Sequence, residues 1–288
     1  MKSPATYASG WRSIRAEYLR GALLTLLLTL SVGVQAAPKA DLWPRWQAHD
    51  AASTRQVDHG VWDRFLQQQV IVGADGIHRI AYGKVPAAQR TALKAYLVAL
   101  QAERVRSLSR AEQRAYWINL YNAATVDIVL AHYPVDSILK ISISPGLFVR
   151  GPWGAKRLRV ENEALSLDDI EHRILRPIWK DPRTHYAVNC ASLGCPNLAT
   201  RAYTAATMES LLDQGAREFI NHSRGAQVRD GRLTVSSIYR WFAEDFGNTD
   251  AGVLAHLRRY ADPALTQSLR GITRIDDAAY DWTLNDAR

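Results

Sequence analysis

Apolar residues recur every three or four positions over much of the chain, which is the spacing of one face of an α-helix. The first of these stretches has a polar interruption at residues 52–59, and several later ones begin at a serine or threonine suited to the N-cap position. The pattern predicts helical segments at residues 41–69, 88–100, 109–130, 166–178, 204–220, 238–242 and 252–260.

Shorter apolar runs predict a few strands. Asp75-Gly76 and Asp230-Gly231 supply the positive φ of tight turns and predict hairpins at residues 70–82 and 228–233. Single strands are predicted at residues 156–160 and 185–190. Long helices with few short strands indicate a helix-rich α+β fold, a single domain around a small sheet that carries Tyr186 to Cys190.

Two of the predicted helices have polar side chains on buried faces. Ser109 and Glu112 form a capping box before a helix that is apolar all round and therefore buried, yet Asn119 and Asn122 lie on one side of it. Buried amides must be hydrogen-bonded, so the pair either caps neighbouring loop backbone or lines a polar cavity.

Ser166 and Asp169 form a second capping box, and Glu171 falls in the middle of the core face of the helix that follows. A carboxylate there must be paired or have a raised pKa, because burying an unpaired charge is costly. His172 lies further round, one turn from Asp168 and Arg176, where a solvated, salt-linked side chain is the simpler interpretation.

Both cysteines of the chain lie in the stretch 185–196, a predicted buried strand followed by a loop of small residues that ends at Pro196. Strand alternation places His185 and Cys190 on opposite faces, so His185 reaches Cys195 only if the loop folds back. Either histidine, His172 or His185, therefore remains a candidate partner for a thiol.

Residues 1–36 have the features of a secretory signal peptide: four basic residues, an apolar run from Gly21 to Val34, and a small-residue cleavage site at Ala36. The run is shorter than the about 20 residues that a membrane span needs. We therefore expect residues 37–288 to be one globular domain, periplasmic or secreted, with no stable membrane insertion after cleavage.

Charge adds little to this picture. Loss of residues 1–36 removes four basic residues and one acidic residue, so the net charge falls from +8 to +5. The arginines are scattered and form no block of five or six, which argues against a nucleic-acid partner. We expect a small molecule or a peptide as the partner instead.

Several segments together resemble the domain of unknown function numbered 547, in its exported bacterial form. They are residues 115–122, residues 167–172, residues 181–190 with Cys195-Pro196, Trp241 with Asp245-Phe246, and residues 280–285. The likeness centres on residues 110–250. It implies a shared fold and a shared set of site residues, and it implies no particular reaction.

The two cysteines allow three interpretations. Export and an even cysteine count favour a structural disulfide Cys190–Cys195, which leaves the protein a non-catalytic module for binding a ligand or protein. A catalytic thiol is the second, and a metal site of His185 and the two thiols is the third, which their spacing disfavours. We therefore expect no metal and no cofactor.

The catalytic interpretation is our preferred hypothesis. A thiol-dependent hydrolase or transferase would use Cys190 or Cys195 as nucleophile, His185 or His172 as base and Glu171 to orient it. The substrate would be a peptide or a small thiol or acyl compound. Asn119 and Asn122 would donate to the developing oxyanion, and Arg183 would contribute to substrate binding.

Overall fold

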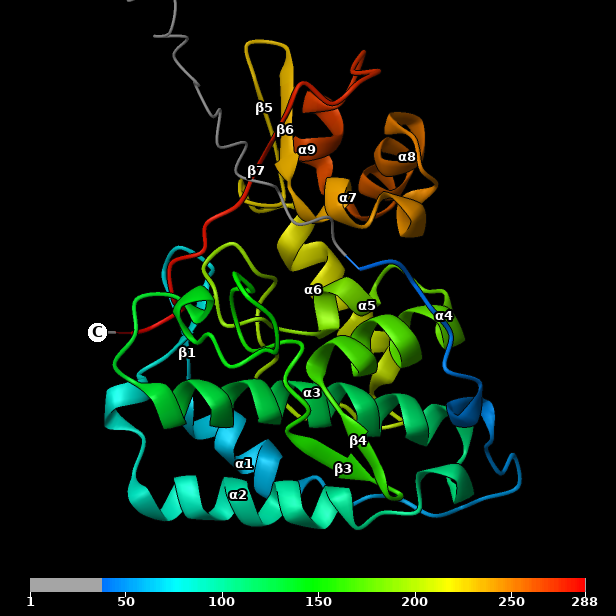
Figure 1. Ribbon diagram of the computed structural model, residues 1–288. Coiled ribbons are helices and arrows are strands. Elements are labelled where there is room, and N and C mark those ends of the chain that lie inside the picture. The colour runs from blue at the N-terminus through cyan, green and yellow to red at the C-terminus, as the bar shows by residue number, and fades with distance from the viewer. Residues whose placement is uncertain (1–37, 288) are drawn as a thin grey trace, which may run out of the picture. The chain divides into compact units, whose positions relative to one another are not determined.

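The computed structural model of the protein describes residues 38–287, and this part of the chain is helix-rich with small sheets (Figure 1). The helix-rich α+β class is confirmed. The helices are α1 (Gly60–Gln69), α2 (Ala87–Gln101), α3 (Arg110–His132), α4 (Arg176–Trp179), α5 (Thr184–Ala187), α6 (Met208–Ile220), α7 (Ile238–Trp241), α8 (Asp250–Tyr260) and α9 (Pro263–Ser268). A π-helical segment, η5 (Asp169–Leu175), runs directly into α4. Short 3₁₀ segments are η1 (Pro44–Gln47), η2 (Tyr82–Lys84), η3 (Val105–Ser107), η4 (Ile138–Lys140) and η6 (Ala243–Phe246).

The strands of the described residues are short and form three separate sheets. They are β1 (Val70–Val72), β2 (His78–Ile80), β3 (Leu158–Val160), β4 (Glu163–Leu165), β5 (Ala226–Arg229), β6 (Arg232–Ser236) and β7 (Asp277–Ala279). Strands β1 and β2, β3 and β4, and β5 and β6 pair antiparallel, whereas β7 lies parallel to β6. Both predicted hairpins are therefore present.

The helix α3 lies at the centre of the larger hydrophobic cluster, packed between α2 and η5 (Figure 1). Its side chains are buried on every side, as the absence of a polar face in its sequence predicts. Trp117 packs edge-on against Trp46 at 5.1 Å between ring centroids. A helix buried in this way provides a rigid support for the segments that contact it.

A second hydrophobic cluster joins α6 to the sheet β5–β6–β7 and to α7 and α8. Tyr186 belongs to this cluster, and its hydroxyl hydrogen-bonds to the hydroxyl of Tyr239 at 3.0 Å and to the ring of His256 at 2.9 Å. The helix α5 therefore links the second cluster to the segment that carries the cysteines.

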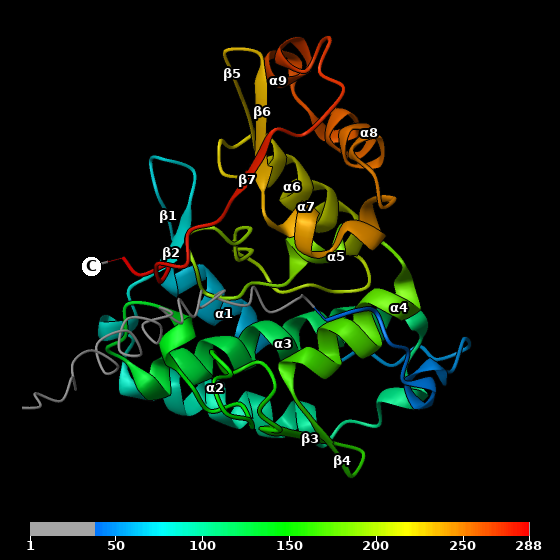
Figure 2. The same ribbon diagram turned by 45° about the horizontal axis from the view of Figure 1, so that its top comes forward.

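The chain after β7 runs from the second cluster to the hairpin β1–β2 (Figures 1 and 2). On its way it pairs with the loop of residues 190–196, which holds both cysteines and is called the cysteine loop below. Leu284 bridges to Ser192, and the amides of Leu193 and Gly194 donate to the carbonyls of Thr283 and Asp281 at 2.8 Å each. Beyond the loop, the amide of Ile80 donates to Asn285 at 3.0 Å.

The predicted strand at residues 185–190 is wrong, and the small sheets do not carry Tyr186 to Cys190. Residues 184–187 form the helix α5, followed by an extended Val188. Asp181 and Pro182 explain this, because the Asp181 carboxylate accepts from the amide of Arg183 at 2.9 Å and a proline suits a first helical turn. The predicted start of the helix at Thr204 also moves, to Met208.

The segment expected to be a signal peptide, residues 1–36, lies outside the described residues. Within residues 38–287, none of the helices combines the length and the apolar character that a membrane crossing requires.

Candidate functional site

Two buried asparagines of α3 bind the backbone on either side of the cysteines. Asn122 donates to the carbonyl of Ala187 and accepts from the amide of Asn189, both at 2.8 Å. Asn119 does the same with Tyr203, donating to its carbonyl at 2.7 Å and accepting from its amide at 3.0 Å. These contacts support the structural interpretation of the two amides, because each binds loop backbone through both its nitrogen and its oxygen.

Asn189, inside the loop, also binds backbone through both its side-chain oxygen and its side-chain nitrogen. Its side-chain oxygen accepts from the amide of Ala191 at 2.8 Å, and its side-chain nitrogen donates to the carbonyl of Pro196 at 2.7 Å. Ala191 has a left-handed backbone, with φ of 58°, which turns the chain sharply after Cys190. The two ends of the loop are thereby brought together, and with them the two thiols.

The thiols are adjacent and reduced. Their sulfurs lie 2.9 Å apart, which is longer than the about 2.05 Å of a disulfide bond. The amide of Cys190 also donates to the sulfur of Cys195 at 2.9 Å. A disulfide between them is therefore not present in this structure. Cys195 is buried, whereas Cys190 is half-buried and is the thiol with access to solvent.

Three side chains converge on the sulfur of Cys190. A hydrogen bond joins it to the sulfur of Cys195 at 2.9 Å, the hydroxyl of Tyr280 lies 3.0 Å away, and the hydroxyl of Ser192 lies 3.4 Å away. Hydrogen bonds from Cys195, and then from Ser192 and Tyr280, lower the pKa of Cys190, although burial and the charge of Glu171 oppose them. Burial and the bond to Cys190 raise the pKa of Cys195 well above its ordinary value. Of the two thiols, Cys190 is therefore the one that loses its proton more readily.

An aromatic wall of Trp153, Trp241, Tyr280 and Trp282 adjoins this sulfur. The ring centroid of Tyr280 lies 4.6 Å from that of Trp282 and 4.8 Å from that of Trp241, and Trp153 packs on Trp282 at 5.7 Å. All four side chains are half-buried. They offer apolar ring surface within reach of a reactive sulfur, which is suited to holding the body of a substrate.

His185 is held between two carboxylates rather than by a thiol. Its Nε2 lies 2.7 Å from Asp245 and its Nδ1 lies 3.7 Å from Glu171, while Phe242 stacks on the ring at 4.4 Å. Burial alone would lower the pKa of His185, but hydrogen bonding and the charges of Asp245 and Glu171 raise it. His185 is therefore protonated over a wider pH range than an ordinary histidine.

Glu171 is the buried carboxylate that its position in the helix predicts, and it is paired. Burial would raise its pKa, yet the charges of His172, His185 and Arg176 lower it to about 2. Burial raises the pKa of Tyr121 well above its ordinary value, and the charges of Glu171 and Cys190 raise it further. Glu171 and Cys190 therefore share the neighbourhood of one tyrosine ring.

His172 is buried, and the simpler interpretation of a solvated side chain is wrong. Its Nδ1 lies 3.0 Å from the guanidinium of Arg176, and burial lowers the pKa of His172 to about 4. Arg176 in turn pairs with Asp245 at 2.5 Å and Glu244 at 2.6 Å. Close packing in the π-helical η5 buries this side of the helix together with Glu171.

The predicted site residues thus fall into two groups. Cys190 and Cys195 form the thiol pair, with Asn122 bound to the residue before Cys190. Glu171, His172 and His185 form a buried charged cluster with Asp245, and neither histidine contacts a thiol among the described residues.

Arg183 belongs to neither group. It is an ion-paired residue of the α5–α6 region, bound to Asp181, Glu209 and Asp213 at 2.7 to 2.8 Å. Among the described residues Arg183 makes no contact with the cysteine loop. The role in substrate binding that the sequence analysis gives it therefore stays a prediction.

Sequence reasoning missed Ser192, Tyr280 and Asp245 as site residues. Tyr280 is 90 positions from Cys190, and only its place in the segment 280–285 that resembles the family marked it. Ser192 lies two residues from Cys190, and this closeness in the sequence is the one local signal that its hydroxyl could contact the thiol. Asp245 was noted beside Phe246, but nothing in the sequence connects it to His185.

Comparison with known proteins gives one match. Residues 105–220 match the model of a family described as a protein of unknown function, DUF547, and this range contains α3, Glu171 and both cysteines. No curated protein and no solved structure matches the chain. Asp245, Trp241 and the segment 280–285 lie outside the matched range. Over residues 105–220 the chain is therefore similar to DUF547, a family whose function is unknown.

Proposed function

We propose that this protein is an exported thiol-dependent transferase or hydrolase, in which Cys190 is the nucleophile that attacks a small acyl or thiol substrate or a peptide. The observation that carries the proposal is the convergence of Cys195, Ser192 and Tyr280 on the half-buried sulfur of Cys190. Hydrogen bonds to a sulfur favour the thiolate, which is the nucleophilic form. A leader at residues 1–36 would direct the protein to the periplasm or outside the cell.

In the proposed reaction the thiolate of Cys190 attacks the carbonyl carbon of a thioester, ester or amide. A sulfur–carbon bond forms, the bond to the leaving group breaks, and the leaving group takes a proton. The thiol of Cys195, 2.9 Å from Cys190 and with a raised pKa, is the nearest proton-bearing group. A second thiol or amine, or water, then attacks the acyl carbon, the sulfur–carbon bond breaks to restore the thiolate of Cys190, and the proton of the acceptor returns to Cys195.

The contacts favour transfer over hydrolysis. Activation of water needs a general base beside the thiol, and the two buried histidines are bound to carboxylates and to Arg176 instead. A thiol acceptor brings its own nucleophilic form and needs no such base.

The same geometry gives one observation in favour of the second candidate, a binding module with a Cys190–Cys195 disulfide. The sulfurs are already adjacent, so oxidation after export would close the bond with little movement of the loop. The aromatic wall would then bind a ligand without chemistry at sulfur.

Alkylation and turnover separate the two candidates. The exported protein is incubated with iodoacetamide at pH 6, and the modified cysteine is identified by mass spectrometry. We expect rapid modification of Cys190 and slow modification of Cys195. We also expect a burst of thiol release from a chromogenic thioester, which Cys190→Ser abolishes. A quantitative Cys190–Cys195 disulfide that resists mild reductant would overturn the catalytic proposal and support the binding module.

A further inference from the structure

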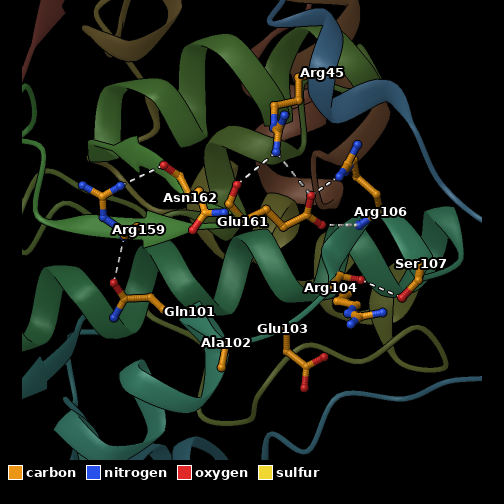
Figure 3. Close-up of a pocket in the computed structure, with 10 residues that line it drawn as sticks. All are labelled: Arg45, Gln101, Ala102, Glu103, Arg104, Arg106, Ser107, Arg159, Glu161 and Asn162. Carbon is orange, nitrogen blue, oxygen red and sulfur yellow. Dashed lines mark hydrogen bonds and ion pairs between the residues drawn. The ribbon is translucent and has the colours of Figure 1, made fainter.

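A cavity of about 740 Å³ opens between the end of α2, the segment η3 and the turn that joins β3 to β4 (Figure 3). Four arginines line it, namely Arg45, Arg104, Arg106 and Arg159. The carboxylates that line it are those of Glu103 and Glu161. Neither cysteine lines this cavity, so the inference below does not depend on the thiol chemistry.

Glu161 is already bound by two of the arginines. Its carboxylate pairs with the guanidinium of Arg106, accepts from the amide of Arg106 at 3.0 Å, and lies 3.7 Å from Arg45. Figure 3 shows this carboxylate between the two guanidinium groups. This part of the wall therefore already binds an oxyanion, with guanidinium groups and a backbone amide as donors.

Two of the arginines that line the cavity have no carboxylate partner. Glu103 pairs at 2.8 Å with Arg55, which does not line the cavity. The guanidinium of Arg159 donates to the carbonyl of Asn162 at 2.8 Å, and within residues 38–287 the guanidinium of Arg104 has neither an ion pair nor a hydrogen bond. Two positive charges, those of Arg104 and Arg159, thus face the cavity without a carboxylate.

The β3–β4 turn holds two of the arginines, Arg45 and Arg159, in place. Glu161 and Asn162 both have left-handed backbone, with φ of 45° and 70°, a conformation that is unusual for glutamate. The carbonyl of Glu161 accepts from Arg45 at 3.0 Å, and that of Asn162 accepts from Arg159. Guanidinium groups that are positioned before binding lose less side-chain freedom when a ligand arrives.

We propose that this cavity binds a phosphorylated ligand, either a soluble phosphate ester or a phosphate headgroup. A phosphoryl group carries about −1.5 to −2 charge at neutral pH, which matches the two unbalanced arginines. The planar guanidinium binds phosphate oxygens through two parallel hydrogen bonds. The cavity volume lies within the about 300–1,000 Å³ of small-molecule sites, so it accommodates more than a single ion.

Titration calorimetry of the full chain with inorganic pyrophosphate tests the proposal, at low salt and at physiological salt. We expect saturable binding at one site. Because a hydrogen bond to a charged group contributes more than a neutral one, replacing Arg104→Gln together with Arg159→Gln should weaken binding about tenfold or more. The matched control is Arg229→Gln, an exposed arginine of β5 that does not line the cavity, and it should leave the affinity unchanged.

A parallel flotation assay with vesicles that contain phosphatidic acid, whose headgroup is a phosphate monoester, distinguishes the two sources of phosphate. Binding of pyrophosphate alone identifies a soluble ligand, and binding of vesicles that pyrophosphate displaces identifies a headgroup. Both outcomes support the site if the double variant loses binding. An absence of binding to both probes, or an equal loss in Arg229→Gln, overturns the proposal, since it would leave only general attraction to a basic protein.

Discussion

At the scale of single residues, the reactivity of Cys190 depends on neighbours that come from separate parts of the chain. Cys195 and Ser192 belong to the same loop, whereas Tyr280 comes from the segment after β7. The hydroxyl of Tyr280 also accepts from the hydroxyl of Ser192 at 3.0 Å, so it contacts both the sulfur and the neighbouring serine. Tyr280 is the one of these residues that can be changed without touching the loop.

Replacing Tyr280→Phe removes this hydroxyl and keeps the aromatic ring. We expect the pKa of Cys190 to rise, because one of the bonds that favour the thiolate is lost. Alkylation by iodoacetamide at pH 6 should slow about threefold to tenfold, the change in thiolate fraction for about half to one pKa unit. Rates measured from pH 5 to 9 should converge at the alkaline end. Tyr203→Phe, a buried tyrosine with no contact to either thiol in the described residues, serves as the control.

Some of this residue-level detail follows from the sequence and some does not. Asn122 could be recognised because an amide on an entirely apolar helix must have a buried partner, and the partner is the backbone of Ala187 and Asn189. The environment of His185 could not be recognised. Its partner Asp245 is 60 positions away, and no local pattern indicates which carboxylate a buried histidine meets.

At the scale of elements, the two predicted capping boxes differ in what they achieve. At Ser166 the box is complete: its hydroxyl accepts from the amide of Asp169 at 3.2 Å, and the Asp169 carboxylate accepts from the amide of Ser166 at 2.8 Å. At Ser109 it is half formed, because the Glu112 carboxylate accepts from the amide of Val57 at 2.7 Å instead. Tertiary contact has redirected the second carboxylate.

Replacing Ser166→Ala should therefore cost more than replacing Ser109→Ala. We expect a loss of about 1–2 kcal/mol in the free energy of unfolding at Ser166, where the hydroxyl also contacts the Asp169 carboxylate, and about 1 kcal/mol or less at Ser109. Urea unfolding of the two variants measures the difference. Equal losses would show that the complete box contributes no more than the single bond.

The helix α5 illustrates why an element can be missed. His185 to Cys190 is short, apolar and followed by a loop, and such a run is equally compatible with a strand and a buried helical turn. The deciding signal lies upstream, in Asp181-Pro182, because an aspartate followed by a proline is typical of the start of a helix. The long helices α2, α3 and α8 were predictable because periodicity over more than ten residues excludes a strand.

At the scale of the whole molecule, the buried charged cluster makes stability depend on pH. The pKa of Glu171 is lowered from its ordinary 4.5 to about 2, so its contribution is present above pH 4.5 and is lost as the pH falls toward 2. The pKa of His185 is raised above 6.5, so its contribution is present below 6.5 and is lost as the pH rises through the raised value. Both contributions are present together between these limits.

Replacing Glu171→Gln tests this dependence. We expect the variant to be less stable than the parent by up to about 3 kcal/mol at pH 5.5, and the difference should shrink as the pH falls from 4.5 toward 2. Urea unfolding at pH 3, 5.5 and 8 measures it. Glu209→Gln, at an exposed side chain, is the control. A difference that stays constant from pH 5.5 to 3 would contradict the assignment of the low pKa to Glu171.

The arrangement of the molecule as a whole was the least predictable level. The α+β class, both hairpins and most of the helices follow from local patterns and were confirmed, whereas the helix predicted from residue 41 is reduced to η1 before α1 begins at Gly60. The approach of the segment 280–285 to the cysteine loop depends on packing between two hydrophobic clusters, and no local pattern encodes it. The cysteine loop at the centre of the site can therefore be recognised in the sequence, whereas the residues that pack against it from distant segments cannot.

The pairing of residues 280–285 with the cysteine loop has a consequence for how the protein matures. These residues are synthesised after every other part of the site, and Tyr280 reaches Cys190 only once they have been made and have folded against the loop. Until that moment the loop lacks the backbone partners of Leu193 and Gly194 and one donor to its sulfur. The nascent chain thus lacks one of the groups that lower the pKa of Cys190, and the surroundings of this thiol are complete only in the finished chain.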